Sequence, residues 1–178
     1  WNLVQIILAA LSEILAQKGS STDKPEQAMR SMGLVALAQQ MNRQGESVLG
    51  ARQTGEILSQ NATAQREAAF ATAKEIGILC EDPEHNVRFI HPLVQQCLAA
   101  FAVREDLTPQ EEVAIAGNNP TLWTMLVTLS SEPEKAIARL LQEDMPGTAT
   151  LAARALIQTQ PAERLVFIDE GWSTPDSF

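Results

Sequence analysis

The chain has 178 residues, of which 45% are hydrophobic, and this length suits one domain of moderate size or two small ones. Its formal net charge of −9 argues against a protein that binds nucleic acid, because contacts from Lys and Arg to phosphates supply most non-specific affinity. Only 4% of the residues are aromatic, and the abundance of Ala, Leu and Gln favours a mainly α fold, because these residues lose little side-chain freedom in a helix.

The first 17 residues predict a helix that has one apolar face, formed by Leu3, Ile7, Leu11, Ile14 and Leu15. This stretch lacks an initiator Met and a basic leader, and its apolar run is too short to span a bilayer. We therefore expect no membrane partner, and we expect residues 1–22 to be the end of a preceding helical domain in a longer protein.

Three further helices are predicted before residue 78. A polar loop over residues 18–27 leads into a helix that is capped by Thr22 or Asp23, runs to about Met41 and stops at Gly45. A short helix over residues 51–60 follows, and a longer one over residues 63–77 ends at Gly77.

Residues 78–90 change from a helical to a strand pattern. Two short apolar runs, at about 78–81 and 86–90, flank the acidic turn EDPEHN and predict a β-hairpin with no larger sheet. Strand alternation directs Phe89 into the core and brings His91 back to the same side. Helices, then a hairpin, then a closing helix form a winged helix, which we predict for residues 23–105.

Residues 106–168 predict short helical hairpins with HEAT-like packing, and residues 169–178 predict a flexible polar tail. Capping boxes are expected at TPQE (108–111) and SEPE (131–134), an Asn-Pro start at residue 119, and a further helix from Thr148. We expect this region to pack against the winged helix through its Leu and Ile residues and through Trp123, a core anchor between helices.

The other candidate residues predict no catalytic or metal site. Cys80 and Cys97 lie in apolar surroundings and are expected to be small buried hydrophobic residues. His85 and the carboxylates of EDPE (81–84) are expected to belong to a solvated turn. Ser20 and Ser21 have no nearby base, which argues against a nucleophilic role.

The stretch FIHPLVQQCLAA (89–100) fits the pattern F-x-H-x-x-x-Q-(E/Q)-x-x-A-A. This pattern resembles the one that closes the winged-helix domain of NACHT-type signal-transduction ATPases, the STAND class. Three further stretches are similar to the family in their general residue pattern: MGLVALAQQMNRQGESVLGARQTGEIL, AKEIGILCED and LWTMLVTLSSEPEKAIARLLQED…TLAARALI. The resemblance therefore covers most of residues 1–160. The chain departs from the family at Gln96, where many relatives have Glu, and at Cys97 and Leu98, where an aromatic residue is common.

The resemblance implies that His91 contacts the β-phosphate of bound ADP and holds the resting, closed conformation. The chain contains neither a Walker A loop nor a Walker B strand, so the ATPase core that would bind ADP or ATP is expected upstream of Trp1, and the chain alone is not an enzyme. The implied partners are that core and, on activation, further copies of the protein, in the cytoplasm. The effector and sensor domains are not implied.

Three alternatives remain open at this point. His91 can simply cap the closing helix or hydrogen-bond a backbone carbonyl. The chain can be a helical scaffold that binds a partner protein. It can also be a DNA-binding winged helix, although residues 45–105 contain 5 basic and 8 acidic residues.

Overall fold

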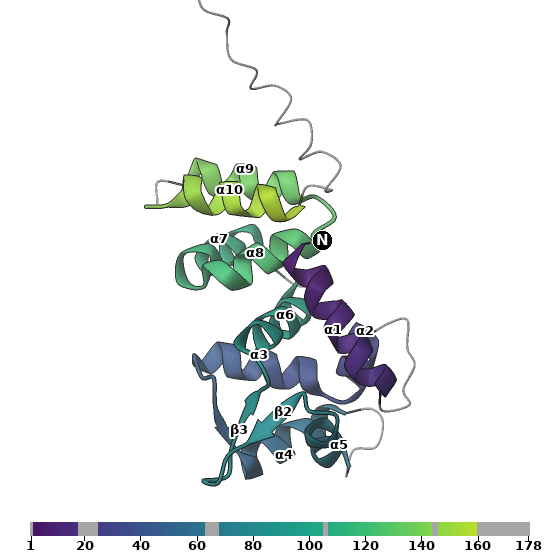
Figure 1. Cartoon of the computed structure of the whole chain (residues 1–178). Coiled ribbons are helices and arrows are strands. Elements are labelled where there is room, and N and C mark those ends of the chain that lie inside the picture. The colour runs from purple at the N-terminus through teal and green to yellow at the C-terminus, as the bar shows by residue number, and fades with distance from the viewer. Residues whose placement is uncertain (1, 18–24, 63–67, 105–106, 144–145, 160–178) are drawn as a thin grey trace, which may run out of the picture.

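A computed structural model describes residues 2–17, 25–62, 68–104, 107–143 and 146–159 (Figure 1). Within these residues the chain forms helices joined by short connections and one small antiparallel sheet, which confirms the mainly α fold. The predicted tail over residues 169–178 and the predicted caps Thr22 and Asp23 lie outside the described residues.

The elements follow one another in an order that separates two groups. The first group is α1 (Leu3–Gln17), α2 (Pro25–Ser31), α3 (Leu34–Gln44), β1 (Leu49–Gly50), α4 (Ala51–Asn61), α5 (Ala69–Glu75), β2 (Leu79–Glu81), β3 (Asn86–Phe89) and α6 (Pro92–Val103). The second group is α7 (Pro109–Asn118), α8 (Pro120–Leu129), α9 (Pro133–Gln142) and α10 (Thr148–Thr159). Figure 1 shows α7 with α8, and α9 with α10, as layers stacked beyond α6.

The sheet has the strand order β1-β3-β2, and all its pairs are antiparallel. The predicted hairpin is confirmed, with Leu79 opposite Phe89. The expectation of no larger sheet is wrong, because Leu49 pairs with Val87 and makes β1 a third strand. A strand of two residues has no periodicity to detect in the sequence, so only the pairing with β3 defines it. The series α3-β1-α4-α5-β2-β3 is the arrangement of a winged helix.

The single helix predicted up to Met41 is wrong, because the chain breaks at Gly33 into α2 and α3. Gly33 has a φ of 75°, which side chains disfavour, and a Cβ there would lie 3.0 Å from the carbonyl oxygen of Leu58. The backbone of Gly33 therefore lies directly against the end of α4. The predicted stop at Gly45 is confirmed by its left-handed conformation after α3.

Most buried hydrophobic residues form one cluster. Each of the helices α1 to α6 contributes residues to it, and so does one face of α8. Within α6, the five consecutive residues 97–101 are buried, between α3 on one side and α8 on the other. The first helix also belongs to this core through Val4, Ile7, Leu11 and Leu15. Burial on both sides explains why α6 shows little difference between its faces in sequence.

A second, smaller cluster joins α7, α8, α9 and α10 around Trp123, which has no exposed surface. Trp123 is thus a core anchor between helices, as predicted. The expectation that it packs against the winged helix is wrong, because it lies on a different face of α8 from Leu122 and Leu126, which do contact that core. Consecutive residues of a helix point about 100° apart, and sequence alone does not say which neighbour each face meets.

The predicted helix starts at Thr108 and Thr148 are confirmed, and the one at SEPE is wrong. Thr108 and Glu111 form the expected capping box on α7, and α10 begins at Thr148. The box predicted at SEPE does not form, because α9 begins one residue later with Glu132 as its N-cap and has no side-chain cap. The hydroxyl of Ser130 instead accepts the N–H of Glu132 at 3.1 Å.

Replacing Gly33 by Ala should destabilise the protein more than replacing Gly45 by Ala. Both changes force alanine into a left-handed conformation, which costs roughly 1–2 kcal/mol. Only Gly33→Ala also brings a Cβ against backbone atoms, since no atom lies within 4 Å of a Cβ at Gly45. Chemical denaturation of both variants measures the difference, and equal losses would contradict the close approach of Gly33 to α4.

Candidate functional site

His91 lies at the junction between β3 and α6, where it is exposed and serves as the N-cap of α6. Its Nδ1 accepts a hydrogen bond from the backbone N–H of Leu93 at 3.1 Å. The simpler interpretation of the sequence, a helix cap, is therefore present in the structure. His91 does not return to the core side with Phe89, because β3 ends at Phe89 and the chain turns into the helix.

The cap determines which ring nitrogen of His91 faces outward as a donor. Because Nδ1 accepts a hydrogen bond, the neutral ring carries its proton on Nε2. Among the described residues, none forms a hydrogen bond with Nε2. The backbone at this helix start is already engaged: Pro92 has no N–H, and the N–H of Val94 donates to the carbonyl of His91 at 3.0 Å. Nε2–H is thus the donor that this junction offers to a ligand.

The remaining residues of the motif hold α6 against its neighbours. Gln95 is 5% exposed, and its side-chain amide donates to the carbonyl of Glu46 at 2.9 Å, which fixes the loop after α3. The oxygen of the Gln96 side chain accepts from Asn119 at 2.9 Å. Ala99 and Ala100 are fully buried, and their small size suits a helix packed between two others.

Asn119 connects three helices. Its Nδ2 donates to Gln96 on α6 and, at 3.1 Å, to the side chain of Asn42 on α3, while its Oδ1 accepts the N–H of Leu122 at 3.1 Å and caps α8. The Asn-Pro start predicted at this position is confirmed. The sequence showed the cap but gave no indication of the contacts to α3 and α6.

A groove of about 890 Å³ lies between α3, α6, α7 and α8, and it includes this polar junction. Amide side chains are frequent in its lining: Gln39, Asn42, Gln44, Gln95, Gln96, Asn118 and Asn119. Pro92, the residue after His91, also lines the groove. Sequence reasoning missed this groove, because its residues come from four helices and have no common spacing.

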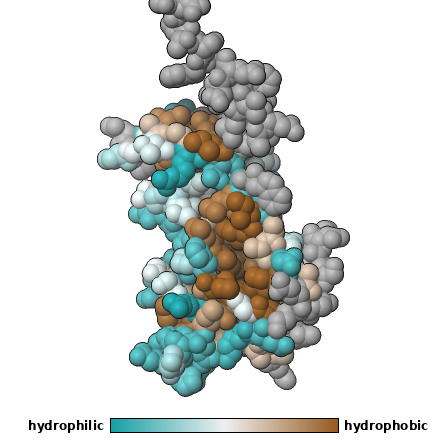
Figure 2. All heavy atoms as spheres, viewed as in Figure 1, coloured by the Kyte–Doolittle hydropathy of each residue, from teal (hydrophilic) through white to brown (hydrophobic). Residues whose placement is uncertain are grey.

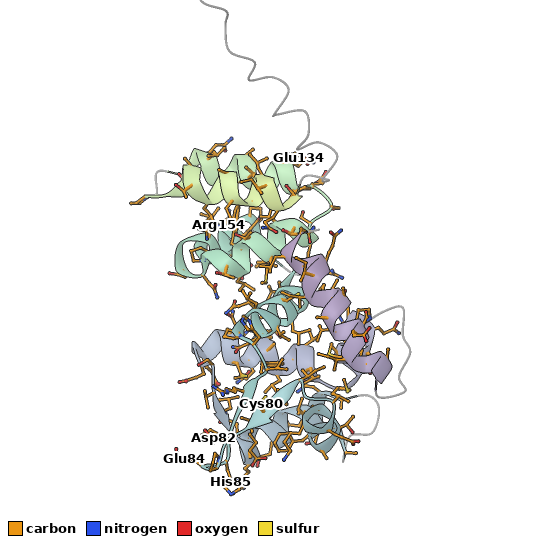
Figure 3. The ribbon with its side chains drawn as sticks, viewed as in Figure 1. Cys80, Asp82, Glu84, His85, Glu134 and Arg154 are labelled. Carbon is orange, nitrogen blue, oxygen red and sulfur yellow. The ribbon has the colours of Figure 1, made fainter. Side chains whose placement is uncertain are left out.

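The turn between β2 and β3, which is the wing, carries acidic residues on a solvated loop, as predicted. Asp82, Glu84 and His85 are exposed and lie at the free end of the hairpin (Figure 3). Lys74 Nζ donates to Glu81 at 2.6 Å, and His85 Nδ1 lies 2.8 Å from the same carboxylate. These hydrogen bonds, that of Lys74 above all, lower the pKa of Glu81, and the backbone N–H of Asn86 lowers the pKa of Asp82.

The two cysteines differ in their surroundings. Cys97 is buried, as predicted, and burial raises the pKa of its thiol to about 12. The prediction that Cys80 is buried is wrong, because strand alternation directs Leu79 inward and leaves Cys80 exposed. Ser20 and Ser21 lie outside the described residues.

No protein-family model matches the chain, and neither a curated protein nor a solved structure matches it. Within the described part of the chain, no helix is long and apolar enough to cross a membrane. The same residues contain no group of three or more His, Cys, Asp or Glu side chains that could hold a metal ion.

Replacing Asn119 by Ala should destabilise the protein by about 2–3 kcal/mol. The change removes an N-cap, at a cost of about 1 kcal/mol, and leaves the amide oxygens of Asn42 and Gln96 without their donor. The control is Asn118→Ala, which alters an exposed residue at the end of α7. Thermal and chemical denaturation measure both, and a similar small effect for the two variants would contradict the role of Asn119 as a three-helix junction.

The contribution of Glu81 to stability should be lost in acid. Because its folded pKa lies below the usual 4.5, the ionised group stabilises the folded state above about pH 4.5, and this contribution is lost as the pH falls through the folded pKa. The difference in unfolding free energy between wild type and Glu81→Gln should therefore shrink as the pH falls below about 4.5. Glu75→Gln, an exposed carboxylate on α5, is the control, and a difference independent of pH would contradict the prediction.

Proposed function

We propose that this chain is the regulatory winged-helix and helical module of a NACHT-type STAND ATPase. In this proposal His91 senses nucleotide by donating a hydrogen bond to a phosphate of ADP held in the ATPase core. The single observation that carries the proposal is the position of His91: an exposed Nε2–H, oriented by the cap on α6, at the strand-to-helix junction of a winged helix.

The geometry around His91 suits a side chain that binds an anion held by another domain. The backbone before His91 is anchored by buried Phe89, and the helix after it is buried along residues 97–101. The imidazole is therefore presented from a fixed base, and an N–H donor presented in this way loses little freedom on binding. A hydrogen bond from an N–H group to a charged acceptor is directional and stronger than one between neutral groups.

The proposal assigns the chemistry to other parts of the protein. ADP and ATP would bind the ATPase core expected upstream of Trp1, and the module itself would not be an enzyme. Release of the contact at His91 would open the protein and permit homo-oligomerisation, in the cytoplasm.

A second candidate is a helical scaffold for a partner protein, which the open groove between α3, α6, α7 and α8 favours. A DNA-binding winged helix is less well supported. In residues 46–62 and 68–91, three side chains are Lys or Arg, and two of them form ion pairs, Arg52 with Glu56 and Lys74 with Glu81. Side chains that already form ion pairs contribute little to binding phosphates.

In the full-length protein, replacing His91 should weaken ADP retention whether or not the helix cap is preserved. His91→Ser keeps an N-cap oxygen but withdraws the outward donor, whereas His91→Leu removes both. A hydrogen bond to a charged group contributes about 1.5–3 kcal/mol, so both variants should release ADP about ten-fold or more readily. The measurements are the ADP dissociation rate, with assembly size by light scattering as a second readout.

Unfolding of the same variants separates nucleotide sensing from capping. His91→Ser should leave stability nearly unchanged, while His91→Leu should lose about 1 kcal/mol with its cap. If ADP retention falls only in His91→Leu, His91 acts as a helix cap and the proposal is wrong. A sequence upstream of Trp1 without a phosphate-binding loop would also overturn it.

A further inference from the structure

The first helix, α1, carries two neighbouring apolar stripes, of which the core buries one and contacts the other only at its two ends. Val4, Ile7, Leu11 and Leu15 are buried against the rest of the fold. A second stripe, which we call the outer stripe, consists of Leu3, Ile6, Ala10 and Ile14, spaced to share one side of the helix. Leu3 and Ile14 are partly buried and touch the core, whereas Ile6 and Ala10 between them are exposed. Its central residue, Ile6, is 52% exposed. A helix that is apolar beyond the face it buries commonly has a further neighbour along that surface.

The end of α10 extends this apolar surface. The backbone N–H of Leu3 donates to the side-chain oxygen of Gln158 at 2.8 Å, which brings the last turn of α10 to the first turn of α1. Leu156 and Ile157, in this last turn of α10, are 39% and 60% exposed. Figure 2 shows hydrophobic residues gathered along α1 and at the end of α10 above it.

The chain itself supplies an apolar segment next to this surface. Thr159 is the last described residue of α10, and the sequence QPAERLVFID follows it, with four large apolar residues in succession at 165–168. Five residues lie between Thr159 and Leu165, and the six steps along the chain span up to about 20 Å when extended. Ile6 lies about one helical turn, roughly 5 Å, beyond Leu3, so residues 165–168 can reach it.

We propose that residues 165–168 pack against the outer stripe of α1 and the exposed end of α10. The short connection raises the effective concentration of the segment at this surface to roughly the millimolar range. The surface has three exposed large side chains, Ile6, Leu156 and Ile157. Their combined area is far smaller than the roughly 800 Å² per partner that a stable dimer buries. A short segment of the same chain therefore fits this surface better than a second copy.

Two truncations of the 178-residue chain and one point variant test the proposal. Ending the chain after Gln160 removes the segment, whereas ending it after Ile168 keeps the segment and removes only the last ten residues. The shorter chain should melt about 3–8 °C below wild type, and the longer one should match wild type. Hydrogen exchange should show that the amides of α1 lose protection several-fold in the shorter chain alone.

Replacing Ile6 by Glu distinguishes a covered from a solvated stripe. In the intact chain Ile6→Glu should lower the melting temperature, and in the chain ending after Gln160 it should cause almost no further change. Equal effects of Ile6→Glu in the two backgrounds, or no effect of removing residues 161–178, would overturn the proposal. If the wild-type chain has the mass of a dimer and Ile6→Glu has the mass of a monomer, the outer stripe binds a second copy, and the proposal is overturned.

Discussion

The burial of α6 on two sides is the constraint on which the rest of the structure depends. Residues 97–101 have almost no exposed surface and lie between α3 of the winged helix and α8 of the following helices. The alanines at 99 and 100 let the neighbouring backbones approach, while Leu98 and Phe101 fill the space between them. A larger residue at either alanine would have to displace α3 or α8, so this helix sets the relation between the two groups of elements.

The same helix explains why His91 is a distinctive residue. After exposed Pro92, every residue of α6 is buried or partly buried, so the helix is most open to solvent at its start. His91 stands at that start, and its cap orients the ring so that Nε2 faces away from the helix. A role as cap and a role in nucleotide sensing therefore do not compete, because they use different nitrogens of one ring.

Polar contacts define the relative position of the helices where apolar packing alone does not. Leucine and alanine faces tolerate small shifts along a helix, whereas the Asn119 amide requires both Asn42 and Gln96 at hydrogen-bond distance. Glu26 adds a similar restraint at the other end of α6, where it pairs with Arg104 at 3.1 Å and with Arg30 at 3.0 Å. The Asn119 contacts thus join α3, α6 and α8 beside the groove, and Glu26 joins α2 to the end of α6.

The sequence by itself determined the features that depend on near neighbours in the chain. Apolar periodicity predicted most of the helices, alternation predicted the β2–β3 hairpin, and local cap chemistry predicted the starts at Thr108 and Asn119. The resemblance of residues 89–100 to a known motif singled out His91, and the sequence also allowed the cap that His91 forms. These interactions span a few residues, so their pattern is visible in one dimension.

Only the tertiary structure decided the features that depend on distant residues. The break at Gly33 reflects the approach of α4, and the two-residue β1 exists because β3 pairs with it. Trp123 belongs to the second core only because α9 and α10 pack against its face of α8. The groove and the Asn42–Gln96–Asn119 junction unite residues up to 77 positions apart. No local propensity encodes such contacts, because their energy arises only when separate elements pack together.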